Sequence, residues 1–175
     1  RSDMRAPLLG CCAAVEQRLE LAGTNRSEIA GAFKDAPAER REGLGFLVEN
    51  MPEADLKSLS TVFLLENLNL AYEAWEKSPW RDKLLKELFF NDVLPYASLN
   101  DELEVWRAKF RADCLPMIAG AKSPGEAAQL LNQKLFPFYK VKYNTARHRP
   151  DQAPGESIAS GRATCTGLAI LLVDA

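Results

Sequence analysis

The sequence has very little histidine and no clustered cysteine, which excludes the commonest patterns of metal-binding residues. Its 175 residues include one histidine, His148, and four cysteines, of which Cys11 and Cys12 are adjacent while Cys114 and Cys165 stand alone. No Cys-x-x-Cys pair or His/Cys cluster is present, so the spacing does not indicate a zinc site. We therefore expect neither a metal nor a cofactor.

The chain also lacks a long apolar run and an excess of either charge. Its longest apolar stretch, residues 168–173, is far too short for a bilayer, which takes about 20 residues. The net charge is −2, without the basic excess that is typical of a nucleic-acid-binding protein. With 47% hydrophobic and 26% charged residues, the composition is that of a globular protein, for which we expect neither a nucleic-acid nor a membrane partner.

Neither the compartment nor the oligomeric state follows from these residues. The charged residues near the start do not resemble the apolar core of a signal peptide. A signal ahead of Arg1 would make the protein extracytoplasmic, and without one we expect a cytoplasmic location.

Residues 1–136 show the periodicity of amphipathic helices separated by short breaks. Two helix starts are indicated by capping residues. Asn25 with Glu28 forms one plausible cap pair, and Ser123 with Glu126 forms the clearest capping box in the chain. We expect this region to be helical throughout.

The pattern changes after residue 137. Residues 138–143 alternate bulky apolar and charged side chains, which predicts a short strand. Residues 144–162 contain two prolines and two glycines, which predicts a long irregular loop. From Thr164 a helix begins that is apolar on nearly all sides, as is typical of the centre of a larger core. We expect the chain to be a fragment of a longer protein, cut inside or just after that helix.

A basic stretch precedes the loop. No Asp or Glu occurs from residue 139 to residue 150, where the cationic residues are Lys140, Lys142, Arg147 and Arg149. With Tyr139 and Tyr143 interleaved, the stretch suits single-stranded nucleic acid, and it equally suits an acidic peptide or a glycan. The simpler interpretation, which we favour, is a solvated edge strand protected by lysines.

Cys165 is the residue with the clearest chemical potential. It lies in the expected first turn of the last helix, with Thr164 as its N-cap. The positive end of the helix dipole and the open N–H groups favour a thiolate there and can stabilise an oxyanion. The alternative is a small residue that fits a tight turn. His148, flanked by Arg147 and Arg149, is expected to be loop surface rather than the base.

Three segments together resemble the transglutaminase-like superfamily, in particular its bacterial members. Residues 160–169 (SGRATCTGLA) are similar to the nucleophile motif, in which a Cys begins the central buried helix. Residues 92–101 (DVLPYASLND), followed by Trp106 and Arg107, resemble the helical segments before the core. Residues 150–157 (PDQAPGES) resemble the connection into the nucleophile loop. The resemblance extends from about residue 88 to residue 175.

This resemblance implies a mainly α chain in which a helical N-terminal region, residues 1–136, leads into a papain-like core. Residues 137–175 would be the first part of that α+β core, truncated after the central helix. It also implies a cysteine hydrolase or acyltransferase that acts on amide bonds of peptide or protein substrates through a thioester, with Cys165 as the nucleophile. Because the family's His and Asp follow the nucleophile, we expect this chain to be inactive.

A second hypothesis about the function stays open. The chain would then be a non-catalytic helical domain that binds another protein, or a degenerate transglutaminase-like fold.

Overall fold

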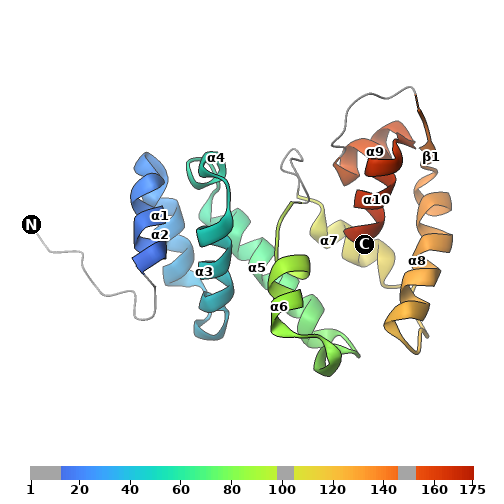
Figure 1. The fold of residues 1–175 in the computed structure, drawn as a ribbon, viewed down its shortest axis with the longest axis horizontal. Helices are drawn as coiled ribbons and strands as arrows, with labels where there is room; N and C mark the ends of the chain where they lie inside the picture. Colours follow the sequence, from blue (N-terminus) through green and yellow to red (C-terminus); the bar gives the residue numbers. More distant parts are fainter. Residues whose placement is uncertain (1–12, 98–104, 146–152) are drawn as a thin grey trace, which may run out of the picture. The chain divides into compact units, whose positions relative to one another are not determined.

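The computed structural model describes residues 13–97, 105–145 and 153–175, and it is mainly helical (Figure 1). It is 72% helical and 3% strand, which confirms the expected mainly α class. The chain divides into two compact units, which we call unit 1 (Arg1–Pro95) and unit 2 (Tyr96–Ala175). Cys165 belongs to unit 2. Because this unit begins at Tyr96, it also includes helices that start before residue 137.

Unit 1 is built only of helices and helical turns in its described part. Its α-helices are α1 (Ala13–Leu21), α2 (Arg26–Asp35), α3 (Arg41–Asn50), α4 (Glu53–Leu56), α5 (Thr61–Lys77) and α6 (Lys86–Leu88). Its turns are η1 (Gly23–Asn25), η2 (Ala38–Arg40), η3 (Arg81–Lys83) and the π-helical turn η4 (Phe89–Val93), which continues α6.

Aromatic side chains fix the end of unit 1 against α5. Phe89 is fully buried; its ring stacks on Trp75 at 4.5 Å between centroids and meets Tyr72 edge-on at 4.8 Å. Aromatic pairs in these geometries contribute beyond the area that they bury. The buried Asn67 side chain donates to the backbone oxygen of Leu94 at 2.9 Å, which ties α5 to the last turn of the unit.

The expected cap pair of α2 is wrong, because both of its side chains bind elsewhere. Asn25 makes no cap bond to α2; its Nδ2 instead donates to the backbone oxygens of Leu56 and Leu59, at 2.8 and 2.9 Å. Glu28 accepts the N–H of Thr61 at 2.7 Å. Carbonyls and amides at helix ends need partners, and here helices distant in sequence supply them.

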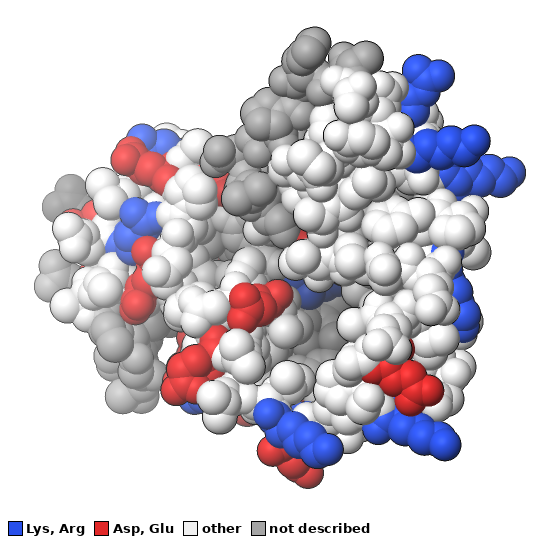
Figure 2. All heavy atoms as spheres, turned by 45° about the vertical axis from the view of Figure 1, so that its right-hand side comes forward, with Lys and Arg blue, Asp and Glu red and all other residues white. Residues whose placement is uncertain are grey.

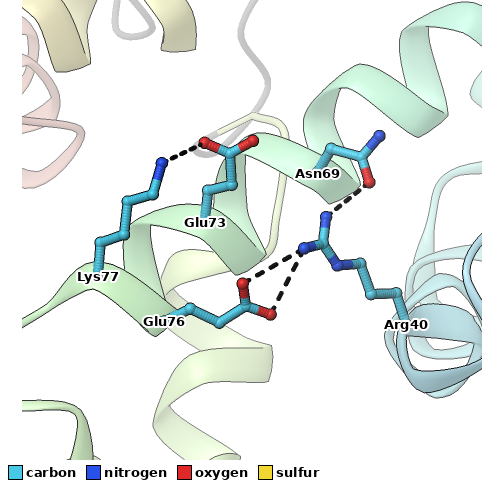
Figure 3. Close-up of polar contacts among 5 residues, drawn as sticks. All are labelled: Arg40, Asn69, Glu73, Glu76 and Lys77. Carbon is cyan, nitrogen blue, oxygen red and sulfur yellow. Dashed lines mark hydrogen bonds and ion pairs between the residues drawn. The ribbon is translucent and has the colours of Figure 1, made fainter.

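The densest polar network of unit 1 joins η2 to α5 (Figure 3). Arg40 donates from Nη1 to Asn69 at 2.8 Å and from Nη2 to Glu76 at 3.3 Å, and its guanidinium lies 5.4 Å from the centre of the Tyr72 ring. One turn away, Lys77 pairs with Glu73 on the same helix at 3.1 Å. The contacts of Arg40 link η2 to α5, whereas the Lys77–Glu73 pair lies within α5, and together they account for these polar side chains as structural groups.

Unit 2 combines helices with one short parallel pair of strands. Its elements are α7 (Arg107–Cys114), α8 (Pro124–Tyr139), β1 (Lys142–Tyr143), α9 (Pro154–Ser160), β2 (Arg162–Ala163) and α10 (Cys165–Val173). In Figure 1, α9 and α10 lie beside α8, and β1 follows the upper end of α8.

Two expectations about this part of the sequence need correction. The strand expected over residues 138–143 is shorter, because α8 continues through Pro137 to Tyr139 and only Lys142–Tyr143 is extended. Pro137 cannot donate a backbone hydrogen bond within the helix, and two residues later the Tyr139 ring stacks on Phe110 at 5.6 Å. The loop expected over residues 144–162 contains α9, which begins at Pro154 and ends at Gly161 in the left-handed conformation.

The core of unit 2 lies between its helices and the strand pair. Its buried residues are Phe110, Cys114, Met117, Leu135, Val141, Ala163 and Leu171. They come from α7, α8, α10 and both sides of the strand pair, so a single core supports the segment that leads into Cys165. The capping box at the start of α8 is present as expected, since Ser123 Oγ accepts the Glu126 N–H at 3.1 Å.

Candidate functional site around Cys165

Cys165 is the first residue of α10, and its side chain is exposed. The chain reaches it directly from β2 through Thr164, whose backbone is extended. Thr164 Oγ1 accepts the N–H of Gly167 at 3.4 Å, which confirms the expected N-cap. The local sequence thus fixes where the helix begins and places the thiol in its first turn.

The first turn of α10 also leaves backbone donors open beside the thiol. Gly167 N–H is bound by the Thr164 side chain, and Leu168 N–H by the Thr164 carbonyl at 2.9 Å. Within the described residues, the N–H groups of Cys165 and Thr166 have no acceptor, as is usual for the first residues of a helix. Such donors can bind an anion or the oxyanion that forms when a thiolate attacks a carbonyl.

One face of α10 packs into unit 2 and the other is open among the described residues. Gly167, Ile170 and Leu171 are buried, whereas Cys165 and Val173 are exposed, as is Ala169 between them. Spacings of four residues put the exposed three on one side of the helix. The sequence of this helix is apolar on nearly all sides, but the described part of the chain covers only one of them.

The other described cysteine lies in a contrasting environment. Cys114 is 3% exposed in the core of unit 2, as its position on the apolar stripe of α7 predicts. Burial, with a smaller contribution from the neighbouring Asp113 carboxylate, raises the pKa of the Cys114 thiol to about 11. Cys114 is therefore an inert core thiol near neutral pH, and Cys165 is the accessible one.

Two charged residues influence each other at the far end of α10. Asp174 is the C-cap residue of the helix, and its charge acts on the Arg107 guanidinium at the start of α7. Burial lowers the pKa of Arg107 to about 10, and the Asp174 charge opposes that shift. A carboxylate at the negative end of a helix dipole is unfavourable by itself, so the nearby cation compensates for it. The sequence analysis missed this pair, for which the only signal is an acidic residue directly after an apolar run.

A second polar cluster fixes the C-terminal end of α8, which leads into β1. Tyr139 donates its hydroxyl hydrogen to Asp113 Oδ2 at 2.6 Å, and Lys109 binds the same oxygen. These hydrogen bonds, first from Lys109 and then from Tyr139, lower the pKa of Asp113. Burial and the bond to Asp113 raise the pKa of Tyr139. The phenol therefore stays protonated and acts as a fixed donor.

The described residues do not supply the remaining parts of a thiol-enzyme site. They contain no histidine, because His148 lies outside them, as do Cys11 and Cys12. Within the same residues, no group of three or more His, Cys, Asp or Glu side chains could hold a metal ion. The arrangement can form and orient a nucleophile and an oxyanion site, whereas general-base catalysis needs a group from elsewhere.

Comparisons with known proteins leave the family open. No family model matches the chain, and neither the curated proteins nor the solved structures that were compared contain a match. Across residues 13–97, 105–145 and 153–175, no helix has the length and apolar content needed to cross a bilayer.

Proposed function

We propose that Cys165 is the nucleophile of a transglutaminase-like cysteine hydrolase or acyltransferase that acts on amide bonds of peptides or proteins. The observation that carries the proposal is the first turn of α10, where an exposed thiol lies beside the open N–H groups of Cys165 and Thr166. In the reaction, Sγ attacks the carbonyl carbon and the N–H groups bind the oxyanion; the C–N bond then breaks to give a thioester, and the leaving nitrogen takes up the proton that the thiol has lost.

The base and the group that orients it are not assigned to any described residue. By the resemblance to the family, a His and an Asp would follow the nucleophile on strands beyond the central helix. A positioned base contributes roughly 10²–10⁴-fold to such reactions. We therefore expect the 175-residue chain to form a thioester from an activated substrate and to turn over ordinary amides too slowly to measure.

An activated ester tests this proposal without a base. In the reaction with p-nitrophenyl acetate, Cys165 Sγ forms a bond to the acetyl carbon, the ester C–O bond breaks, and p-nitrophenolate leaves. We expect one acetyl group on the Cys165 peptide by mass spectrometry, removable by hydroxylamine, and formed faster than on the free peptide of residues 160–169. The variant Cys165→Ser should not accumulate it. Acetylation at the rate of the free peptide would overturn the proposal.

A second function is supported by a separate observation in unit 1. Leu85, which precedes α6 with an extended backbone, and Leu88, the last residue of α6, are 65% and 47% exposed. Two exposed apolar side chains this near each other in sequence suit binding to another protein. On this reading the chain is a non-catalytic interaction domain. Binding that survives Cys165→Ser and is lost in Leu85→Ser would favour it over the thiol enzyme.

A further inference from the structure

The strand pair next to Cys165 has one open edge. Lys142 N–H donates to the Gly161 carbonyl at 3.0 Å and Asn144 N–H to the Ala163 carbonyl at 2.9 Å. In a parallel ladder the residue between two such donors turns its own backbone groups the other way. The N–H and C=O of Tyr143 therefore point away from β2, and within the described residues neither has a partner.

The opposite edge of the pair is closed by its own chain. Ser160 Oγ donates to the Arg162 carbonyl at 3.0 Å and accepts the Arg162 N–H at 3.4 Å. The single hydrogen of this hydroxyl is shared with the Glu156 carbonyl at 2.8 Å, one turn earlier on α9. An extended segment that adds to this sheet must therefore add at β1, where the backbone of Tyr143 can pair with it.

Two cationic residues, one in β1 and one just before it, occupy backbone positions that are unfavourable for a lysine. Lys142 lies directly opposite Arg162 in the ladder, and like charges in that position repel each other. Lys140 ends α8 with φ 56°, in the left-handed conformation that favours Gly or Asn. Residues that break a local rule without a structural gain are typical of binding sites.

The charge of this edge is not balanced along the strand. From residue 136 to residue 145 the sequence has no Asp or Glu. Figure 2 shows Lys and Arg side chains along its upper right edge, with no Asp or Glu among them, over the part of unit 2 that carries β1. Asp113, which binds Tyr139 of this segment, is also bound to Lys109. The Tyr143 side chain beside these cations is 60% exposed.

The nucleophile follows the strand pair at its carboxyl end. The two strands are parallel, so their carboxyl ends lie at the same end of the pair, and only Thr164 separates β2 from Cys165. A peptide paired with β1 would lie two strand spacings, roughly 10 Å, from β2. A peptide that continues past the end of β1 can therefore turn one of its amides toward Cys165 while a residue a few positions away lies against Lys142.

We propose that the β1 edge binds an extended acidic peptide segment, whose main chain pairs with Tyr143 and whose carboxylates bind Lys140 and Lys142. A peptide fits better than a glycan, because the open N–H and C=O call for main-chain amides. Only the last step, the delivery of an amide to Cys165, rests on the proposed function; the binding itself does not need the thiol.

Fluorescence anisotropy with the whole chain tests this. The probe is a short fluorescein-labelled peptide in which glutamate alternates with threonine, and the comparison peptide has glutamine in place of glutamate. We expect the glutamate peptide to bind more tightly. Replacing both cations (Lys140→Gln with Lys142→Gln) should weaken its binding roughly tenfold. Lys122→Gln, which removes one charge just before the opposite end of α8, should not change it.

Each alternative outcome overturns the inference. Equal binding of the two peptides would show that the peptide's charge does not contribute to binding. Unchanged binding of a peptide with N-methylated alternate amides would show that its main chain does not pair with β1. A single-stranded oligothymidine that binds equally well at the same lysines makes the surface a nucleic-acid platform. In Cys165→Ser the peptide should bind as before. Loss of binding with intact acetylation of Cys165 would reject the edge proposal and leave the nucleophile in place.

Discussion

In unit 1, side chains from distant helices bind several of the backbone groups left open at helix ends, whereas unit 2 caps two of its helices locally and leaves other backbone groups open. Arg18 donates to the carbonyls of Val48 and Met51, and the Glu28 carboxylate accepts the Thr61 N–H at 2.7 Å. These links span about thirty residues of sequence each. They make unit 1 a scaffold whose polar groups are used in folding.

Unit 2 uses its polar residues differently. The starts of α8 and α10 are capped from within three residues, by Ser123 and by Thr164, and the sheet edge at Arg162 is closed by Ser160. The first turn of α10 and the edge at Tyr143 stay open within the described residues. These open backbone groups lie beside an exposed thiol, and we therefore expect the proposed function to reside in unit 2.

The largest expected effect is in the core of unit 2. Leu135 is fully buried beside Phe110 and Val141, and Leu135→Ala should cost roughly 2–5 kcal/mol through the cavity that it leaves. Hydrogen exchange of α8 amides measures the change in the opening free energy. Leu115→Ala, at a residue that is 52% exposed, should stay within about 0.5 kcal/mol of the original chain. Equal effects of the two substitutions would show that Leu135 is not part of a packed core.

The next effect tests the long-range links of unit 1. Asn25→Ala leaves the carbonyls of Leu56 and Leu59 without their donor and should cost about 2 kcal/mol, measured by exchange of α2 and α4 amides. The matched control is Asn50→Ala, since Asn50 binds only the Phe46 carbonyl one turn earlier on the same helix. If neither substitution changes the opening free energy, the long-range hydrogen bonds of unit 1 do not stabilise it and the contrast between the two units is wrong.

Two glycines of α3 should respond with opposite signs. A Cβ at Gly43 would lie 2.7 Å from the hydroxyl of Tyr72, so Gly43→Ala should destabilise unit 1 by roughly 1–3 kcal/mol. At Gly45 the nearest atom would be a methyl of Val15 at 3.9 Å, so Gly45→Ala should stabilise it by about 0.5–1 kcal/mol. Hydrogen exchange of α3 amides distinguishes the two, and Tyr72→Phe should partly rescue Gly43→Ala. A stabilising Gly43→Ala would contradict the close α3–α5 contact.

The smallest effect concerns the cluster at the end of α8. Tyr139→Phe removes one donor from Asp113, so the pKa of that carboxyl should rise toward its ordinary value while Lys109 still lowers it. A carboxylate with a lowered pKa stabilises the fold above the ordinary Asp value, near 3.9, and the contribution disappears as the pH falls through the folded pKa. NMR titration of Asp113 measures the shift. An unchanged titration curve of Asp113 would show that Tyr139 does not donate a hydrogen bond to it.

The local features of the chain could be predicted from the sequence. The caps at Ser123 and Thr164 depend on residues within three positions, and the buried position of Cys114 follows from helical spacing. The signals of α9 were also present, in Pro154 at its start and Gly161 after its end, but the loop-like composition around them outweighed them.

Features that depend on which segments meet could not be predicted. Nothing in the sequence near Asn25 indicates that its amide binds the end of α4 instead of capping α2. Lys142 pairs with Arg162 although α9 lies between them in the sequence. This pairing leaves the backbone groups of Tyr143 open on the other edge of the strand. The basic stretch was visible in the sequence, whereas its place beside Cys165 required the fold.

The most direct measurement compares the two described thiols in one experiment. Folded and urea-denatured chains are treated with iodoacetamide, and the alkylation rates of Cys165 and Cys114 are read from their peptides by mass spectrometry. We predict that folding accelerates alkylation of Cys165 and suppresses that of Cys114, because the first turn of α10 holds an exposed thiol beside open N–H groups and the core around Cys114 excludes the reagent. If folding slows both thiols alike, Cys165 is not an activated nucleophile and the account of unit 2 is wrong.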